Sequence, residues 1–105
     1  MGNSNLSNTE LLKAVLEPLL DDFQYWFDYA YHLLENERMD FISNQEQSDL
    51  FSRIKQAQAE LNTTKLLFKA TDGQVGVDMA VLRPWHQLVS ECWYVGTQFR
   101  KSKEK

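Results

Sequence analysis

Apolar residues recur at intervals of three and four positions along the first 41 residues of the chain. This spacing follows the 3.6-residue period of an α-helix, so it predicts one long amphipathic helix with a single buried face. Ser7 followed by Glu10 matches a capping box, which places the start of this helix near Asn8. The predicted buried residues are Leu12, Leu16, Leu19, Phe23, Trp26, Ala30, Leu33, Leu34 and Phe41.

Pro18 lies inside this helical pattern. Its ring clashes with the carbonyl four residues earlier, and its nitrogen donates no hydrogen bond. We expect either a kink in one long helix or a break at which Pro18 opens a second helix.

Two further helical segments follow. Ser43 and Glu46 repeat the capping-box pattern, and the second helix should run to about Ala70, where Asp72 and Gly73 provide a stop. Its apolar stripe is Leu50, Ile54, Ala57, Leu61, Thr64 and Phe68. The start of the third helix is open, because Asp78 could cap a short turn through Leu82 while Pro84 could occupy the first position of the main helix. Its stripe is Trp85, Leu88, Val89, Cys92, Gly96 and Phe99.

These patterns predict an all-α fold, an antiparallel three-helix bundle with a long kinked first helix and a glycine-containing loop before the third helix. The length of 105 residues, with 43% hydrophobic and 25% charged residues, is typical of one globular core. We expect a single helical domain over residues 8–100. It should be flanked by a flexible N-terminus, residues 1–7, and a basic flexible tail, residues 101–105.

The net charge of −4 is unevenly distributed. Residues 8–41 carry eight carboxylates against Lys13 and Arg38. Such acidity repels phosphate, and the basic residues Arg100, Lys101, Lys103 and Lys105 form only a short terminal cluster, so nucleic-acid binding has little electrostatic support. The chain contains no apolar run long enough for a membrane span, and its polar start and single cysteine favour a cytoplasmic location.

Candidate chemistry is sparse. Asp28, His32 and Glu35 share one helical face at the spacing of a metal or acid-base site, but no other helix supplies matching ligands, so we expect solvated surface and no metal. His86 and Glu91 are five residues apart and should point away from each other. Cys92 lies on the buried stripe, where a thiol packs as a small hydrophobe, although attachment of a linear tetrapyrrole or nucleophilic catalysis stays open.

Six aromatic residues fall within positions 23–31. On a helical projection Phe23, Trp26 and Phe27 join the buried stripe, whereas Tyr25 and Tyr29 point outward. The outward surface would comprise Asp21, Asp22, Tyr25, Asp28, Tyr29 and His32. It can be a docking patch, because tyrosine is enriched at interfaces and negative charge steers a basic partner, or ordinary exposed surface.

A second candidate surface lies at the end of the second helix. Leu66 and Leu67 lie off its buried stripe. Either the loop of residues 75–82 folds back over them, or a partner covers them together with the region near Arg83.

Three segments resemble a family of small cyanobacterial proteins of unknown function, about 100 residues long. They are residues 11–27 (LLKAVLEPLLDDFQYWF), 53–61 (RIKQAQAEL) and 67–93 (LFKATDGQVGVDMAVLRPWHQLVSECW). The last is the most specific, through its Lys-Ala-Thr string, two glycines and Pro-Trp-His string. The resemblance implies a cyanobacterial cytoplasm and a role near photosynthetic physiology, but it supplies no catalytic or cofactor-binding residue.

Two functional classes remain. The first is a non-enzymatic interaction module, adaptor or regulatory, that docks on a larger protein with a basic surface; self-association is also open. The second is a helical bundle that binds a tetrapyrrole or another small ligand. We favour the first, with no cofactor, no catalytic residue, no nucleic acid and no membrane insertion.

Overall fold

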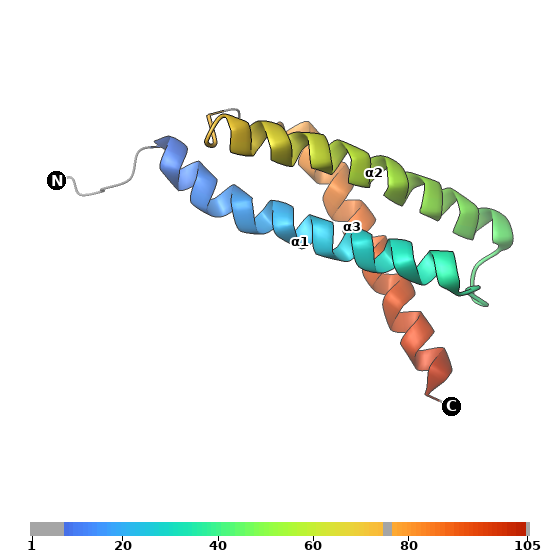
Figure 1. Ribbon diagram of the computed structural model, residues 1–105. Helices are drawn as coiled ribbons and strands as arrows, with labels where there is room; N and C mark the ends of the chain where they lie inside the picture. Colours follow the sequence, from blue (N-terminus) through green and yellow to red (C-terminus); the bar gives the residue numbers. More distant parts are fainter. Residues whose placement is uncertain (1–7, 75–76, 105) are drawn as a thin grey trace.

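The computed structural model describes residues 8–74 and 77–104. It contains α1 (Asn8–Asn36), α2 (Asn44–Ala70) and α3 (Met79–Lys103). Figure 1 shows α1 and α2 side by side and antiparallel, with α3 crossing behind them obliquely and its last turns projecting beyond α1. α1 packs against both other helices. The predicted all-α, three-helix architecture is confirmed.

α1 runs through Pro18 as one helix of 29 residues, so the alternative of two separate helices is wrong. Pro18 is exposed, and it removes only the hydrogen bond of its own nitrogen, which the rest of the helix tolerates. The helix begins at Asn8, as predicted. The first predicted capping box depends on Ser7, which lies outside the described residues.

The capping box at the start of α2 is confirmed. The Glu46 backbone N–H donates to Ser43 Oγ at 3.0 Å, and the Ser43 N–H donates to Glu46 Oε1 at 2.8 Å. The bond from the Ser43 backbone N–H to the Glu46 carboxylate lowers the pKa of this carboxyl below its ordinary value, and the Ser43 side chain adds to the decrease.

Gln47 connects the end of α1 to the start of α2. Its side-chain nitrogen donates to the carbonyl oxygens of Leu34 and Glu37 at 3.1 and 2.8 Å. Its Oε1 accepts from the Met39 N–H at 2.9 Å and from Arg38 Nη1 at 2.8 Å. One side chain therefore satisfies carbonyls at the end of α1 and fixes the turn that follows.

The stop after α2 lies where the sequence predicts it. Asp72 and Gly73 both have positive φ, 51° and 80°, and the Gly73 N–H donates to the Phe68 carbonyl at 2.8 Å. Asp72 also forms an ion pair with Lys13 of α1, and the Lys13 stem lies against Gly73. The connection after α2 is thereby held against the first turns of α1.

α3 is a single helix capped by Asp78, whose carboxylate accepts from the Ala80 N–H at 2.9 Å. Pro84 lies inside it, so the proposed short turn followed by a separate helix starting at Pro84 is wrong. The helix continues to Lys103, and the predicted tail over residues 101–105 is therefore helical for its first three residues.

Most stripe residues are buried, and the core also includes Leu20, Met39, Leu82 and Val95, which the stripes omitted. Leu12 was predicted to be buried but is 52% exposed. The reason is the oblique path of α3, which leaves the first turns of α1 without a cover on that side (Figure 1). The full core is Leu16, Leu20, Phe23, Phe27, Ala30, Leu34, Met39, Leu50, Ile54, Ala57, Leu61, Phe68, Leu82, Trp85, Leu88, Cys92 and Val95.

Candidate partner-binding surfaces

The outward side of α1 keeps part of the predicted docking patch. Tyr25 is 60% exposed, and Asp22 and His32 are exposed as well. The Tyr25 ring stands edge-on against Trp26, with 5.1 Å between centroids, so the indole holds the tyrosine in place. Trp26, predicted to be buried, is only partly buried and is not part of the core. We call Asp22, Tyr25, Trp26 and His32 the α1 face.

Two carboxylates of the predicted patch lie at its edge and bind α2. Asp21 Oδ1 accepts from Lys65 Nζ at 2.8 Å, and Asp28 Oδ1 accepts from Gln58 Nε2 at 2.8 Å. Lys65 also reaches Gln24. Asp21 and Asp28 therefore add negative charge beside the α1 face, while their side chains tie α1 to α2.

Tyr29 does not point outward as predicted, because it packs on α3. A Cβ atom added at Gly96 would lie 2.9 Å from Tyr29 Cε2 and 3.2 Å from its hydroxyl oxygen. The helical projection assumed one buried face, whereas α3 crosses α1 on a second side and covers Tyr29 there. The Tyr29 ring also stands edge-on to Trp26, with 5.8 Å between ring centroids.

The predicted trio Asp28, His32 and Glu35 is divided among other partners. Glu35 accepts a long hydrogen bond of 3.4 Å from the Tyr31 hydroxyl, and Asp28 is taken by Gln58. Within residues 8–74 and 77–104, no three His, Cys, Asp or Glu side chains are grouped so that they could hold a metal ion. His32 therefore has no arrangement around it that would mark a metal site.

His86 and Glu91 point to different helices, as their spacing predicts. The His86 ring lies edge-on to Phe23 of α1, with 5.0 Å between centroids. Glu91 instead forms a two-point ion pair with Arg53 of α2, in which Arg53 Nη1 lies 2.9 Å from Glu91 Oε2.

Cys92 is fully buried, which confirms its predicted packing role. Burial raises the pKa of the thiol to about 12, and the negative charge of neighbouring Glu91 adds to the increase. The thiol is therefore protonated and shielded at neutral pH, the opposite of an activated nucleophile.

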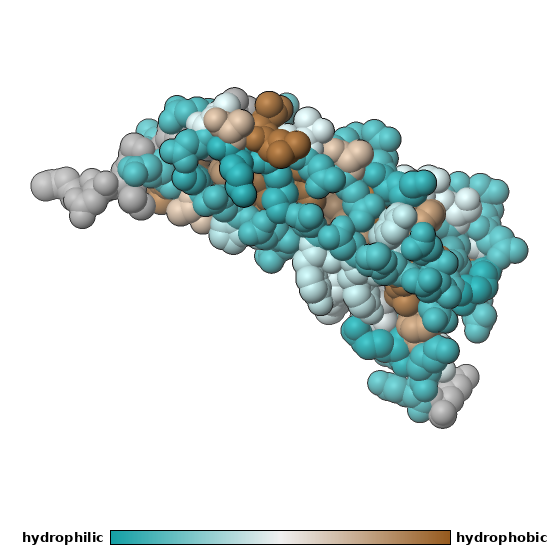
Figure 2. Space-filling view, in the orientation of Figure 1, coloured by the Kyte–Doolittle hydropathy of each residue, from teal (hydrophilic) through white to brown (hydrophobic). Residues whose placement is uncertain are grey.

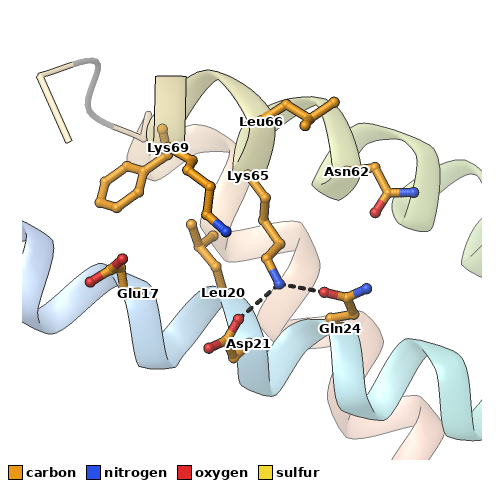
Figure 3. Close-up of a pocket in the computed structure, with 9 residues that line it drawn as sticks. Glu17, Leu20, Asp21, Gln24, Asn62, Lys65, Leu66 and Lys69 are labelled. Carbon is orange, nitrogen blue, oxygen red and sulfur yellow. Dashed lines mark hydrogen bonds and ion pairs between the residues drawn. The ribbon is translucent and has the colours of Figure 1, made fainter. Parts of the chain in front are cut away.

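A groove of about 450 Å³ runs between α1 and the C-terminal half of α2. Figure 3 shows Lys65 reaching across it to Asp21 and Gln24, while Lys69 extends into it opposite Glu17. Its complete lining is Glu17, Leu20, Asp21, Gln24, Asn62, Lys65, Leu66, Phe68 and Lys69.

The second predicted surface stays open to solvent. Leu66 and Leu67 are 70% and 51% exposed, so residues 77–82 do not cover them as expected; residues 75 and 76 of the predicted loop lie outside the described residues. Figure 3 shows Leu66 pointing away from α1, and Figure 2 shows an apolar patch over this end of α2. Arg83 is exposed in the first turns of α3. Cover by a partner is the alternative that stays open.

The sequence patterns missed a cleft between α2 and α3. It has a volume of about 590 Å³, and Tyr94 lines it while remaining 54% exposed. The signal in the sequence was Tyr94 itself, a large aromatic residue off the buried stripe of its helix. Its lining is Ile42, Glu46, Asp49, Leu50, Arg53, Gln87, Ser90, Glu91, Tyr94 and Val95.

A family model described as "Protein of unknown function (DUF2605)" matches residues 6–101. The chain belongs to this family. Neither the curated proteins nor the solved structures provide a match. Among the described residues of this DUF2605 protein, no helix has both the length and the apolarity needed to cross a membrane. The family brings no activity with it, so the functional argument depends on the surfaces described above.

Proposed function

We propose that this DUF2605 protein is a non-enzymatic interaction module that docks a partner with a basic surface through the α1 face. The observation that carries the proposal is Tyr25, a large aromatic side chain held 60% exposed on a rigid helix by its contact with Trp26. Rigid aromatic residues are typical anchors of interfaces, because little side-chain entropy is lost when they are covered.

The charges around Tyr25 support a basic partner. Asp22 is exposed beside it, and Asp21 keeps a largely exposed side chain despite its bond to Lys65. Carboxylates at the rim of an interface mainly accelerate association and make it sensitive to salt. A cyanobacterial cytoplasm and a role near photosynthetic physiology are part of this proposal, and the resemblance is their only support. We expect no catalytic residue, metal or cofactor.

The test is capture of a host protein by Tyr25→Ala compared with the wild-type chain. Truncation of an anchor should weaken the complex by about 1 to 4 kcal/mol. Leu11→Ala is the control, because Leu11 is a similarly exposed apolar side chain of α1, 55% exposed, but lies about 21 Å before Tyr25 along the helix. Equal capture by Tyr25→Ala and the wild type would refute docking through the α1 face.

Asp22→Lys separates steering from anchoring. It should slow association and reduce its dependence on salt, with a smaller effect on dissociation. Surface plasmon resonance with the captured partner measures both rates. An unchanged association rate would contradict the proposed steering.

The groove between α1 and α2 favours a second candidate, a bundle that binds a tetrapyrrole or another anionic small ligand. Lys69 extends into this groove, where its ammonium group could bind a carboxylate of the ligand (Figure 3). Protein purified from its host should then carry visible absorbance that Lys69→Met reduces. A colourless preparation would contradict a pigment, and an absorbance unaffected by Lys69→Met would place the pigment elsewhere.

A further inference from the structure

The cleft between α2 and α3 is apolar at its floor and acidic at its rim. Leu50 and Val95 belong to the core, and Ile42 packs against it. Glu46 and Asp49 are exposed at the edge. α3 borders the first half of α2 here but crosses it obliquely, which leaves the cleft between the two helices (Figure 1).

The rim keeps a negative charge despite the presence of Arg53. Both terminal nitrogens of the Arg53 guanidinium group, Nη1 and Nη2, bind the carboxylate of Glu91, so this pair is electrically balanced. Glu46 and Asp49 then remain as the charges that a ligand of the cleft would meet. A basic helix is therefore the complementary occupant.

The chain carries such a helix in its own α3. The last turns of α3 project beyond α1 and contain Arg100, Lys101 and Lys103 (Figure 1). Lys101 lines a second hollow with Gln98, Ser102, Asp40 and Phe41. Lys101 is the cation that lines this hollow, and the three cations of these last turns outnumber the two nearby carboxylates, Asp40 in the hollow and Glu104 at the C-cap of α3.

Both regions lie on one face of α3. Gln87, Glu91, Tyr94, Gln98 and Lys101 are separated by four, three, four and three residues, which keeps them on the same side of a helix. Tyr94 is at the centre, with its ring edge-on to Phe41 and more than half of the residue exposed. Tyr94 itself lines the cleft whose rim carries Glu46 and Asp49 of α2, and Lys101 lies about two turns further along the same face of α3.

Such a surface is complementary to itself. We propose that two copies of this chain pair through antiparallel α3 helices centred on Tyr94, so that the basic end of each α3 enters the acidic α2–α3 cleft of the other. A two-fold axis makes every contact twice, which is how a small isologous surface gains affinity. The α1 face is not used, so this pairing is independent of the proposed docking function.

Sedimentation equilibrium of the full chain tests the pairing. The mass should rise from 12.3 kDa towards twice that value as concentration increases, and added salt should oppose the increase. Tyr94→Ala should weaken the dimer by roughly tenfold or more, because it removes the central anchor. Tyr25→Ala on the α1 face is the matched control and should associate like the wild type. A wild-type chain that stays monomeric at every concentration overturns the proposal.

Reversal of single charges makes the test specific. Asp49→Lys changes the cleft, and Lys101→Glu changes the end of α3; both residues are exposed, and circular dichroism verifies that each variant keeps its helices. Each variant alone should associate at least roughly tenfold more weakly. An equimolar mixture of the two variants should recover association. In the mixed dimer, the cleft lysine of Asp49→Lys faces the new glutamate of Lys101→Glu, and the second contact keeps the original Asp49 and Lys101. A dimer insensitive to both reversals, or a mixture that recovers nothing, would show that the pairing uses another surface.

Discussion

The contact between Tyr29 and Gly96 predicts that Gly96→Ala destabilises the protein when Tyr29 is present and stabilises it when Tyr29 is replaced by alanine. A Cβ atom at position 96 would lie 2.9 Å from Tyr29 Cε2, closer than carbon atoms normally approach. In Gly96→Ala, either the Tyr29 ring or α3 must move. Such overpacking typically costs about 1 to 3 kcal/mol, while alanine in place of glycine inside a helix contributes about 1 kcal/mol in its favour. The single variant should therefore lose about 0 to 2 kcal/mol of unfolding free energy.

Removal of the tyrosine ring isolates the two effects. In a Tyr29→Ala background, the added methyl group at position 96 meets no ring, and only the helix-propensity term remains. Gly96→Ala should then stabilise the protein by up to about 1 kcal/mol. The coupling energy of the double-mutant cycle equals the steric cost, about 1 to 3 kcal/mol.

Urea denaturation followed by circular dichroism at 222 nm, roughly the helix minimum, measures all four proteins of the cycle. Tyr25 provides the control, because it lies one turn earlier on α1 and is not among the atoms nearest Gly96. The Tyr25→Ala and Gly96→Ala changes should be additive. If the coupling with Tyr29 is below about 0.5 kcal/mol, the ring does not constrain the crossing of α1 and α3, and our account of that contact is refuted.

Gln47→Glu should lower the free energy of unfolding by about 1 to 3 kcal/mol, because a carboxylate cannot donate hydrogen bonds to the carbonyls at the end of α1. Gln45→Glu, at an exposed position, is the control, and equal denaturation midpoints for the two variants would show that Gln47 does not hold this turn. The pKa of Glu46 is lowered in the folded protein, so its carboxylate contributes to stability above the ordinary pKa of 4.5, and this contribution is lost as the pH falls below 4.5. The Glu46→Gln variant should therefore lose less stability in acid than the wild type, and parallel acid titrations of the two proteins would refute this. Cys92 should resist iodoacetamide until the protein unfolds, because burial raises its pKa to about 12, and modification of the folded protein at the rate of a free thiol would contradict its burial. Leu61→Ala should lower the free energy of unfolding, measured by denaturant titration, by about 2 to 5 kcal/mol. A decrease of less than about 0.5 kcal/mol would mean that the surrounding side chains fill the cavity or that Leu61 lies outside the core.

Local signals in the sequence were sufficient for both ends of α2, whereas α1 ends at Asn36 although its predicted stripe runs to Phe41, and the start of α3 was left open. The capping box at Ser43 and the stop at Gly73 involve residues within five positions of each other, so their chemistry can be read directly. Stripe residues such as Ile54 and Cys92 were also predictable, because amphipathic period alone places them inside.

The direction of α3 could not be predicted in this way. It depends on a tertiary contact, in which Tyr29 of α1 fits over the bare backbone of Gly96. Helical period marks one apolar face and does not show from which side a third helix arrives. Tyr29 was therefore placed outside, and Leu12 inside, for the same reason.

Polar contacts between helices were equally beyond reach. The bonds from Lys65 to Asp21 and from Gln58 to Asp28 join residues 44 and 30 positions apart. On the sequence these carboxylates are indistinguishable from the solvated Asp22. The register of α1 against α2 determines which of these carboxylates accept hydrogen bonds from α2.

The turn fixed by Gln47 also bears on the order in which the chain folds. Its bonds reach only 8 to 13 residues along the backbone, so closing this connection costs little chain entropy. α1 and α2 can therefore associate early as a helical hairpin, while α3 must be recruited across a longer separation. We expect backbone amides facing the α1–α2 contact to exchange with deuterium most slowly and those in the projecting end of α3 most quickly. The end of α3 would then open locally while the rest of the domain stays folded.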